Sequence, residues 1–211
     1  MPLIYQHSIN SNTRLGVWQI TEQENFFLSN ALQAPASMHP QRRLQYLAAR
    51  FLLTELIPDF PIDAIALSDA GKPHLPNGAF DFSISHTADF AAAIVSTDAK
   101  VGIDAEIPAP RIFKVQHKFM HPEELDLIAP FENILPLQTL LTVCWSAKET
   151  LYKWHGVGQL DFKQHLRLVH LEGDEKQGII TAQIAQCNGE RIPLAYSVIN
   201  GFVLCWAATD R

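Results

Sequence analysis

The hydrophobic pattern of this chain changes from helical to extended twice, once in each half. In the first half, Gln41–Ile57 places apolar residues at helical spacing, and extended segments follow at Phe80–Ser85 and Phe90–Ser96. In the second half, Pro136–His155 is predicted as a longer helix. Strands are expected after it at Leu166–Leu171, Gly178–Ala185, Leu194–Ile199 and Val203–Ala208. This order predicts an α+β fold with two halves of similar size.

Local signals add detail at both ends of the chain. Strands are predicted at Leu3–Ile9 and Leu15–Ile20, and Thr21–Glu24 has the spacing of a capping box that would open a short helix. Pro122–Glu124 is typical of a first helical turn, because Pro suits position N1 and acids favour the positive end of the helix dipole. Asn200-Gly201 predicts a two-residue hairpin turn.

Composition limits the domain count and the partners. The chain has 211 residues, of which 47% are hydrophobic and 18% charged, enough for one moderate domain or two small ones. Polar Thr97-Asp98 is the best candidate boundary and predicts domains at 1–98 and 99–211. The net charge of -6 argues against a nucleic-acid partner, since such surfaces carry clustered Lys and Arg.

Membrane and secretion signals are not found in the sequence. No apolar run approaches the ~20 residues that a bilayer-spanning helix needs, and the N-terminus lacks a basic segment followed by an apolar one. A cytoplasmic protein with no membrane partner is therefore expected. The three cysteines, Cys144, Cys187 and Cys205, lack metal-ligand spacing and are expected to be buried thiols.

Two short segments carry the candidate chemistry. Asp104 and Glu106 are separated by one residue in a strand-like stretch, so both leave it on the same face. Glu149 and Lys153 are four apart in a helical stretch and also share a face. Together they offer three carboxylates and one ammonium group, the set that a hard cation and a phosphorylated ligand require.

Each pair also has an ordinary explanation. An acid pair on a strand arises by chance, and a Glu–Lys pair at this spacing is common on helix surfaces. Asp104 and Glu106, however, interrupt an otherwise apolar strand, where two like charges are costly without a cation.

Cationic and small residues of the first half suggest a phosphate site. Arg43 and Arg50 are seven residues apart and share one helix face. Gly71-Lys72-Pro73 is a rigid turn whose backbone could approach a flat ring closely. Ser85 and His86 end a strand with donors suited to phosphate. A solvated arginine face, a plain connection and a strand-end histidine are the alternatives.

The succession of these motifs resembles the 4'-phosphopantetheinyl transferases, specifically the surfactin-synthetase-activating class with both halves in one chain. The resemblance covers residues 43–153, and its most specific parts are Val101–Glu106 and Trp145–Lys153. It implies a monomer whose two similar α+β halves are related by a pseudo-twofold axis, with coenzyme A in the cleft between them. It also implies transfer of phosphopantetheine from coenzyme A to a serine of an apo carrier protein, with release of adenosine 3',5'-bisphosphate.

The resemblance implies a role for each candidate residue. Asp104, Glu106 and Glu149 are similar to the Mg²⁺ ligands, and Lys153 to a contact with the diphosphate. Asp104, Glu149 and Lys153 are thereby the expected catalytic residues. The base that accepts the serine proton is expected to be Glu149 or a water on the metal ion, with Glu124 as a weaker candidate. The residues that resemble the 3'-phosphate and adenine contacts are Arg43, Arg50, His86, Ser85, Gly71, Lys72 and Pro73.

Some positions depart from the family pattern. Ser83 stands where many members have Asn, and Ile107-Pro108 stands where some have a Thr that contacts the diphosphate. Residues 35–40 contain no Lys or Arg, so a weaker grip on the 3'-phosphate and acceptance of dephospho-coenzyme A are expected. One segment is expected to be either a docking surface for the acidic carrier or an amphipathic helix whose apolar side packs in the core: Phe113, Lys114, His117, Lys118, Phe119 and Met120.

Other functions and acceptors stay open. A metal-dependent nuclease could use similar carboxylates, but the acidic net charge counts against it. A silent relative that only binds coenzyme A or a carrier is opposed by the presence of all three carboxylates. The carrier could serve fatty-acid, peptide or polyketide synthesis, and the sequence does not choose among these.

Overall fold

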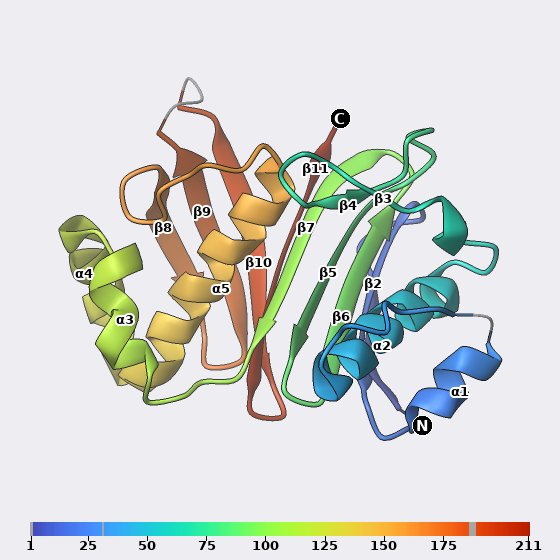
Figure 1. The fold of residues 1–211 in the computed structure, drawn as a ribbon. Helices are drawn as coiled ribbons and strands as arrows, with labels where there is room; N and C mark the ends of the chain where they lie inside the picture. The colour runs from blue at the N-terminus through green and yellow to red at the C-terminus, as the bar shows by residue number, and fades with distance from the viewer. Residues whose placement is uncertain (1, 31, 186–188) are drawn as a thin grey trace. The chain divides into compact units, whose positions relative to one another are not determined.

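The computed structural model describes residues 2–30, 32–185 and 189–211 (Figure 1). It mixes helices and strands, which confirms the predicted α+β class. The chain divides into two compact units, Met1–Val101 with Asp210–Arg211, and Gly102–Thr209. The pseudo-twofold axis implied by the resemblance stays a prediction. Among the described residues, none of the helices combines the length and the apolar character needed to cross a bilayer.

The first unit contains an antiparallel sheet with the strand order β1-β2-β6-β5. Its strands are β1 (Leu3–Ser8), β2 (Thr13–Gln19), β5 (Asp81–Thr87) and β6 (Phe90–Ser96). Helix α2 (Pro40–Leu56) lies across one face of this sheet (Figure 1). Alternate residues of β6, Ala91, Ala93 and Val95, join Leu52 of α2 in a buried cluster. The small alanine side chains leave room for the helix.

One helix start in this unit differs from the prediction. Helix α1 (Glu24–Ser29) begins after Gln23, which makes no side-chain cap, so the expected capping box at Thr21 is wrong. The acid that would close the box, Glu24, instead pairs with Arg43 of α2 at 2.5 Å. The remaining elements of the unit are the 3₁₀ helix η1 (Ile62–Ala64) and the strands β3 (Ala66–Leu67) and β4 (Pro73–His74).

The second unit contains a five-stranded sheet with the order β7-β11-β10-β9-β8. Its strands are β7 (Ala99–Glu106), β8 (Leu166–Gly173), β9 (Gln177–Ile184), β10 (Arg191–Ile199) and β11 (Phe202–Asp210). Helix α5 (Leu137–His155) crosses one face (Figure 1), and its Leu141, Ala147 and Leu151 belong to the buried core. The shorter helices are α3 (Ile112–Phe119), α4 (Pro122–Ile128) and η2 (Ala129–Asn133).

The start and stop signals of this unit are confirmed. His121 caps α4, Pro122 is its first residue, and Glu124 closes the capping box by accepting from the His121 amide at 2.7 Å. Helix α5 ends at Gly156, which has φ +79°. Asn200 and Gly201 both have positive φ and turn the chain between paired Ile199 and Phe202.

Gly102 lets helix α5 approach strand β7 closely. A Cβ atom at this position would lie 2.5 Å from the carbonyl oxygen of Thr150 and 3.0 Å from the backbone nitrogen of Trp154. Both neighbours are backbone atoms of α5, so a side chain could not displace them without moving the helix. A glycine is therefore required here by space, not by φ.

We predict that Gly102→Ala destabilises the protein by about 2 kcal/mol or more, because overpacking against backbone outweighs the gain of up to ~1 kcal/mol that Ala has over Gly in a strand. Urea unfolding followed by circular dichroism measures the change. An unchanged or higher midpoint would contradict the close contact between β7 and α5.

Candidate functional site

Asp104 of β7 is held by two side chains of helix α5. The carboxylate is only 4% exposed. Its Oδ2 accepts a hydrogen bond from Ser146 Oγ at 2.8 Å, and its Oδ1 accepts one from Lys153 Nζ at 2.8 Å. Lys153 Nζ also donates to the carbonyl oxygen of Ile103 at 3.2 Å. Ser146 and Lys153 are two helical turns apart, so one face of α5 supplies both donors.

Glu106 lies on the same face of β7 and also contacts α5. Trp145 Nε1 donates to its Oε1 at 3.3 Å, and Arg111 Nη2 lies 3.7 Å from its Oε2. Burial raises the pKa of the Glu106 carboxyl, and the charge of Asp104 raises it further, while Trp145, Arg111 and Lys153 lower it. The predicted arrangement of the two strand acids on one face is therefore present.

Glu149 completes the group from the helix side. Burial raises the pKa of its carboxyl to about 7, with added repulsion from Asp104 and Glu106 and a partial opposing effect of Lys153. These interactions bring Glu149 within electrostatic reach of both strand acids.

The three acids suit a hard cation by chemistry but are not arranged as a ready-made cage. Mg²⁺ prefers carboxylate oxygens. The pKa values of Glu106 and Glu149 are raised first by burial and then by neighbouring negative charge, and a cation would offset that charge. Among the described residues, however, no group of three or more His, Cys, Asp or Glu side chains is placed to hold a metal ion. Lys153 and Arg111 interact with two of the acids instead. The Mg²⁺ site stays a prediction.

A buried ion pair between α5 and α4 was not predicted from the sequence. Lys148 and Glu124 are both 0% exposed, and Lys148 Nζ lies 2.8 Å from Glu124 Oε2. The same ammonium donates to the carbonyl oxygens of Phe119 and Phe162. Lys148 shares the apolar face of α5 with Leu141, a spacing that could have revealed its burial.

Glu124 has a structural role, which argues against its candidacy as a base. Besides Lys148, its carboxylate accepts the amide of Leu168 at 2.8 Å and the amide of His121 at 2.7 Å. Both oxygens are thus committed to the junction of α4, α5 and β8, and the side chain has no exposed surface. A buried carboxylate with these partners is not available to a substrate hydroxyl.

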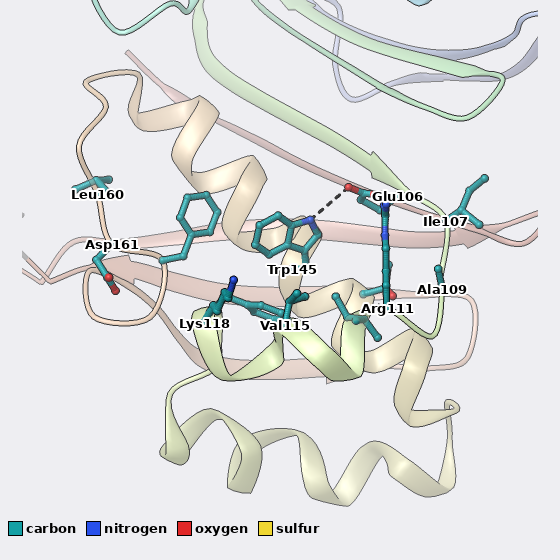
Figure 2. A pocket seen from close by; sticks show the side chains of 13 residues that line it. Glu106, Ile107, Ala109, Arg111, Val115, Lys118, Trp145, Leu160 and Asp161 are labelled. Carbon is teal, nitrogen blue, oxygen red and sulfur yellow. Dashed lines mark hydrogen bonds and ion pairs between the residues drawn. The ribbon is translucent and has the colours of Figure 1, made fainter. Parts of the chain in front are cut away.

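An apolar cavity of about 560 Å³ opens beside Glu106 (Figure 2). Trp145 forms its wall, stacked on Phe162 at 5.3 Å and in edge contact with Phe119 at 5.1 Å. Figure 2 shows Val115 and Lys118 of α3 along the lower side, Arg111 at the Glu106 end, and the loop of Leu160 and Asp161 at the opposite end. The remaining lining residues are Ile107, Ala109, Ile112 and Thr142.

The predicted arginines of the first unit have protein partners. Arg43 pairs with Glu24 of α1 at 2.5 Å. Its Nε is buried and has no hydrogen-bond partner within the described ranges. The Arg50 guanidinium is 7% exposed and lies 3.4 Å from the ring centroid of Tyr46. Burial lowers the pKa of Arg50, and Tyr46 partly opposes this.

The other predicted contacts of the first unit lie in a turn at Gly71-Lys72-Pro73 and on strand β5. Gly71 has φ +77° and donates its amide to the Ser68 carbonyl, so the turn at Gly71-Lys72-Pro73 is present. Lys72 Nζ lies 3.8 Å from Asp81, and burial lowers its pKa. On β5, Ser85 is buried while His86 is exposed, so these neighbours leave the strand on opposite faces. Their roles toward phosphate stay predictions.

The cysteines do not add a nucleophile. Burial raises the pKa of the Cys144 thiol to about 12, and that of Cys205 is also raised by burial. Both therefore remain neutral thiols, as expected from the sequence. Cys187 lies outside the described residues.

We predict that Glu149→Gln stabilises the metal-free protein at high pH. The folded pKa near 7 exceeds the ordinary value of 4.5, so stability from the protonated form is complete below pH 4.5 and is lost as the pH rises through 7. At pH 8 the variant should gain about 1–3 kcal/mol over the parent, and at pH 4 almost nothing. Urea unfolding in EDTA at both values measures this; an equal difference at both would contradict it.

Comparison with known proteins shows which family shares this arrangement. Residues 100–206 match the 4'-phosphopantetheinyl transferase superfamily, and residues 30–96 match the 4'-phosphopantetheinyl transferase N-terminal domain. The first of these matches alone covers half of the chain and includes Asp104, Glu106, Glu149 and Lys153.

Individual relatives carry corresponding names. The chain is similar to 4'-phosphopantetheinyl transferase AcpT of Salmonella typhimurium, with 35% identity over 130 residues, 59% of this chain and 63% of the relative. It is 28% identical over 116 residues to enterobactin synthase component D of Salmonella typhi, 54% of this chain and 48% of the relative. It is 28% identical over 130 residues to L-aminoadipate-semialdehyde dehydrogenase-phosphopantetheinyl transferase of Xenopus laevis, 53% and 43%. The matches thus span about half of these relatives, and the chain belongs to the 4'-phosphopantetheinyl transferase superfamily.

Proposed function

We propose that this protein transfers 4'-phosphopantetheine from coenzyme A to a serine hydroxyl of an apo carrier protein. One observation carries the proposal. Glu149 and Lys153 of α5 lie close to Asp104 and Glu106 of β7, and all four residues belong to the region that matches the superfamily. The name of enterobactin synthase component D supports a carrier protein of a synthase as acceptor.

The reaction needs a diphosphate held while a serine oxygen attacks. The serine Oγ forms a bond to the phosphorus that bears the pantetheine arm, the bond from that phosphorus to the bridging oxygen breaks, and adenosine 3',5'-bisphosphate leaves with the electron pair. Mg²⁺ held by Asp104, Glu106 and Glu149 would supply neutralisation of the diphosphate charge. Lys153 would contact a phosphate oxygen as a point charge.

The serine proton needs an acceptor near the attacking oxygen. Glu149 supports this role because it lies beside Asp104 and Glu106 in the acidic group itself. Glu124, in contrast, is fully buried and bonded to Lys148. Glu149, or a water molecule that it orients, is therefore the proposed proton acceptor.

The cavity beside Glu106 suits the pantetheine arm. This arm is an elongated, mostly uncharged chain attached directly to the diphosphate. The cavity is largely apolar and has the size usual for small-molecule sites, and Glu106 lies at one of its ends. A diphosphate near Glu106 would therefore direct the arm along Trp145 toward Leu160 (Figure 2).

The first unit would hold the 3'-phosphate and the adenine. The buried Nε of Arg43 has no hydrogen-bond partner in the part of the chain that the structure describes, which supports an anion contact, because a phosphate oxygen would satisfy this donor. Its competing Glu24 pair and the lack of Lys or Arg at residues 35–40 support a modest grip.

We predict a mass gain of one phosphopantetheine on an apo carrier when the protein is incubated with coenzyme A and Mg²⁺, measured by intact-protein mass spectrometry over a panel of apo carriers. Asp104→Ala and Glu149→Ala should lower the rate at least ~100-fold, because charge on the diphosphate is no longer offset. Asp126→Ala, an exposed acid of α4, is the matched control and should retain full rate. Transfer that survives in both site variants would refute the proposal.

We predict that Val115→Trp, which fills the cavity, raises KM for coenzyme A about tenfold, equivalent to ~1.4 kcal/mol of binding. The matched control is Val157→Trp, since Val157 is 70% exposed and does not line the cavity. Initial rates over a range of coenzyme A concentrations give the KM of each variant. Equal KM values in the two variants would exclude the arm from this cavity.

A further inference from the structure

Lys153 forms an ion pair with Asp104. Its ammonium lies 2.8 Å from Oδ1 and also reaches the carbonyl oxygen of Ile103, while Ser146 bonds Oδ2. Both oxygens of a carboxylate that is nearly inaccessible to solvent are therefore engaged by side chains of α5. Because these oxygens are already engaged, the three acids do not form a preformed metal site, although carboxylates are suitable ligands for a metal ion.

An ammonium and a divalent ion cannot both sit close to one small carboxylate at low cost. Like charges repel strongly over such distances when burial reduces screening by solvent. The Lys153 side chain is 25% exposed, so its long, flexible stem can carry the ammonium away from Asp104. Arg111 is freer still, at 77% exposure and 3.7 Å from Glu106.

We propose that Lys153 is an internal counter-ion of Asp104 that a divalent cation replaces, and that the released ammonium then becomes the contact for the diphosphate. This inference rests on the proposed function, because it assumes that the ion and the diphosphate share this site. The exchange couples the two ligands: release of Lys153 opposes metal binding, and a phosphate that pairs with the released ammonium favours it. Such coupling is reciprocal, so each ligand raises the affinity for the other.

Metal binding without any nucleotide tests the exchange directly. Mn²⁺ serves as the probe and is titrated calorimetrically into the parent protein, Lys153→Met and Lys114→Met. Lys153→Met keeps the length of the stem and removes the competing charge, so it should bind Mn²⁺ about tenfold more tightly than the parent. Lys114 is exposed on α3, and its variant controls for the loss of one positive charge. Equal or weaker binding by Lys153→Met would overturn the proposal.

The position of the ion is checked in the double variant Asp104→Asn with Lys153→Met. Mn²⁺ binding should be lost, because the replaced counter-ion and the ion share the same carboxylate. Undiminished binding would move the ion away from Asp104 and would also overturn the proposal. Thermal unfolding of each variant shows that it is folded before titration.

A second measurement uses the parent protein and does not depend on any variant. Mass spectrometry of peptides after brief acetylation reports the reactivity of each lysine amine. Mg²⁺ should raise the acetylation of Lys153 several-fold, since the amine leaves its carboxylate, while exposed Lys114 stays constant. Unchanged reactivity of Lys153 at saturating Mg²⁺ would overturn the exchange. Neither measurement involves a carrier protein, so a parent protein that fails to transfer phosphopantetheine is a separate result.

Discussion

The close contact of helix α5 with strand β7 at Gly102 is the constraint on which the site depends. Because no side chain separates the two backbones there, α5 carries Ser146 and Lys153 to within 2.8 Å of Asp104, two residues along the strand. Strand alternation then places Glu106 within hydrogen-bond distance of the Trp145 indole. A single small residue therefore determines the depth at which all the candidate groups meet, although it contributes no chemistry.

A second constraint links the core to the cavity through Lys148. Its ammonium is paired with Glu124 and bonds the carbonyl oxygens of Phe119 and Phe162, the two rings that flank Trp145. Burying such a charge is costly and adds little stability by itself. What it adds is a fixed geometry: the end of α3, the loop before β8 and helix α5 are held to one point. The hydrogen bonds of Lys148 thus fix the backbone at Phe119 and Phe162, whose rings contact Trp145 in the cavity wall.

The sequence predicted what depends on periodicity and missed what depends on distant partners. Strand alternation and helical spacing correctly placed Asp104 with Glu106 and indicated the long helices, because these rules act over a few residues. The pairing of Lys148 with Glu124 spans 24 residues, and the cavity needs side chains from four segments, so no local pattern contains either. The capping box at Thr21 failed because a tertiary contact, Glu24 of α1 with Arg43 of α2, overrode a local signal.

The protein accommodates the three acids Asp104, Glu106 and Glu149 in three different ways, and this supports a functional role for them. Asp104 is stabilised by two donors, Glu106 by an indole and a distant guanidinium, and Glu149 by a pKa that burial raises toward the protonated form. None of these arrangements is the best that a stable core could adopt, since an apolar residue at 149 would avoid the cost of burial. Sequences that keep such local conflicts usually do so at sites where a ligand relieves them. A positively charged ligand would relieve the conflict here, as the proposed Mg²⁺ would, and Lys153 does so only in part.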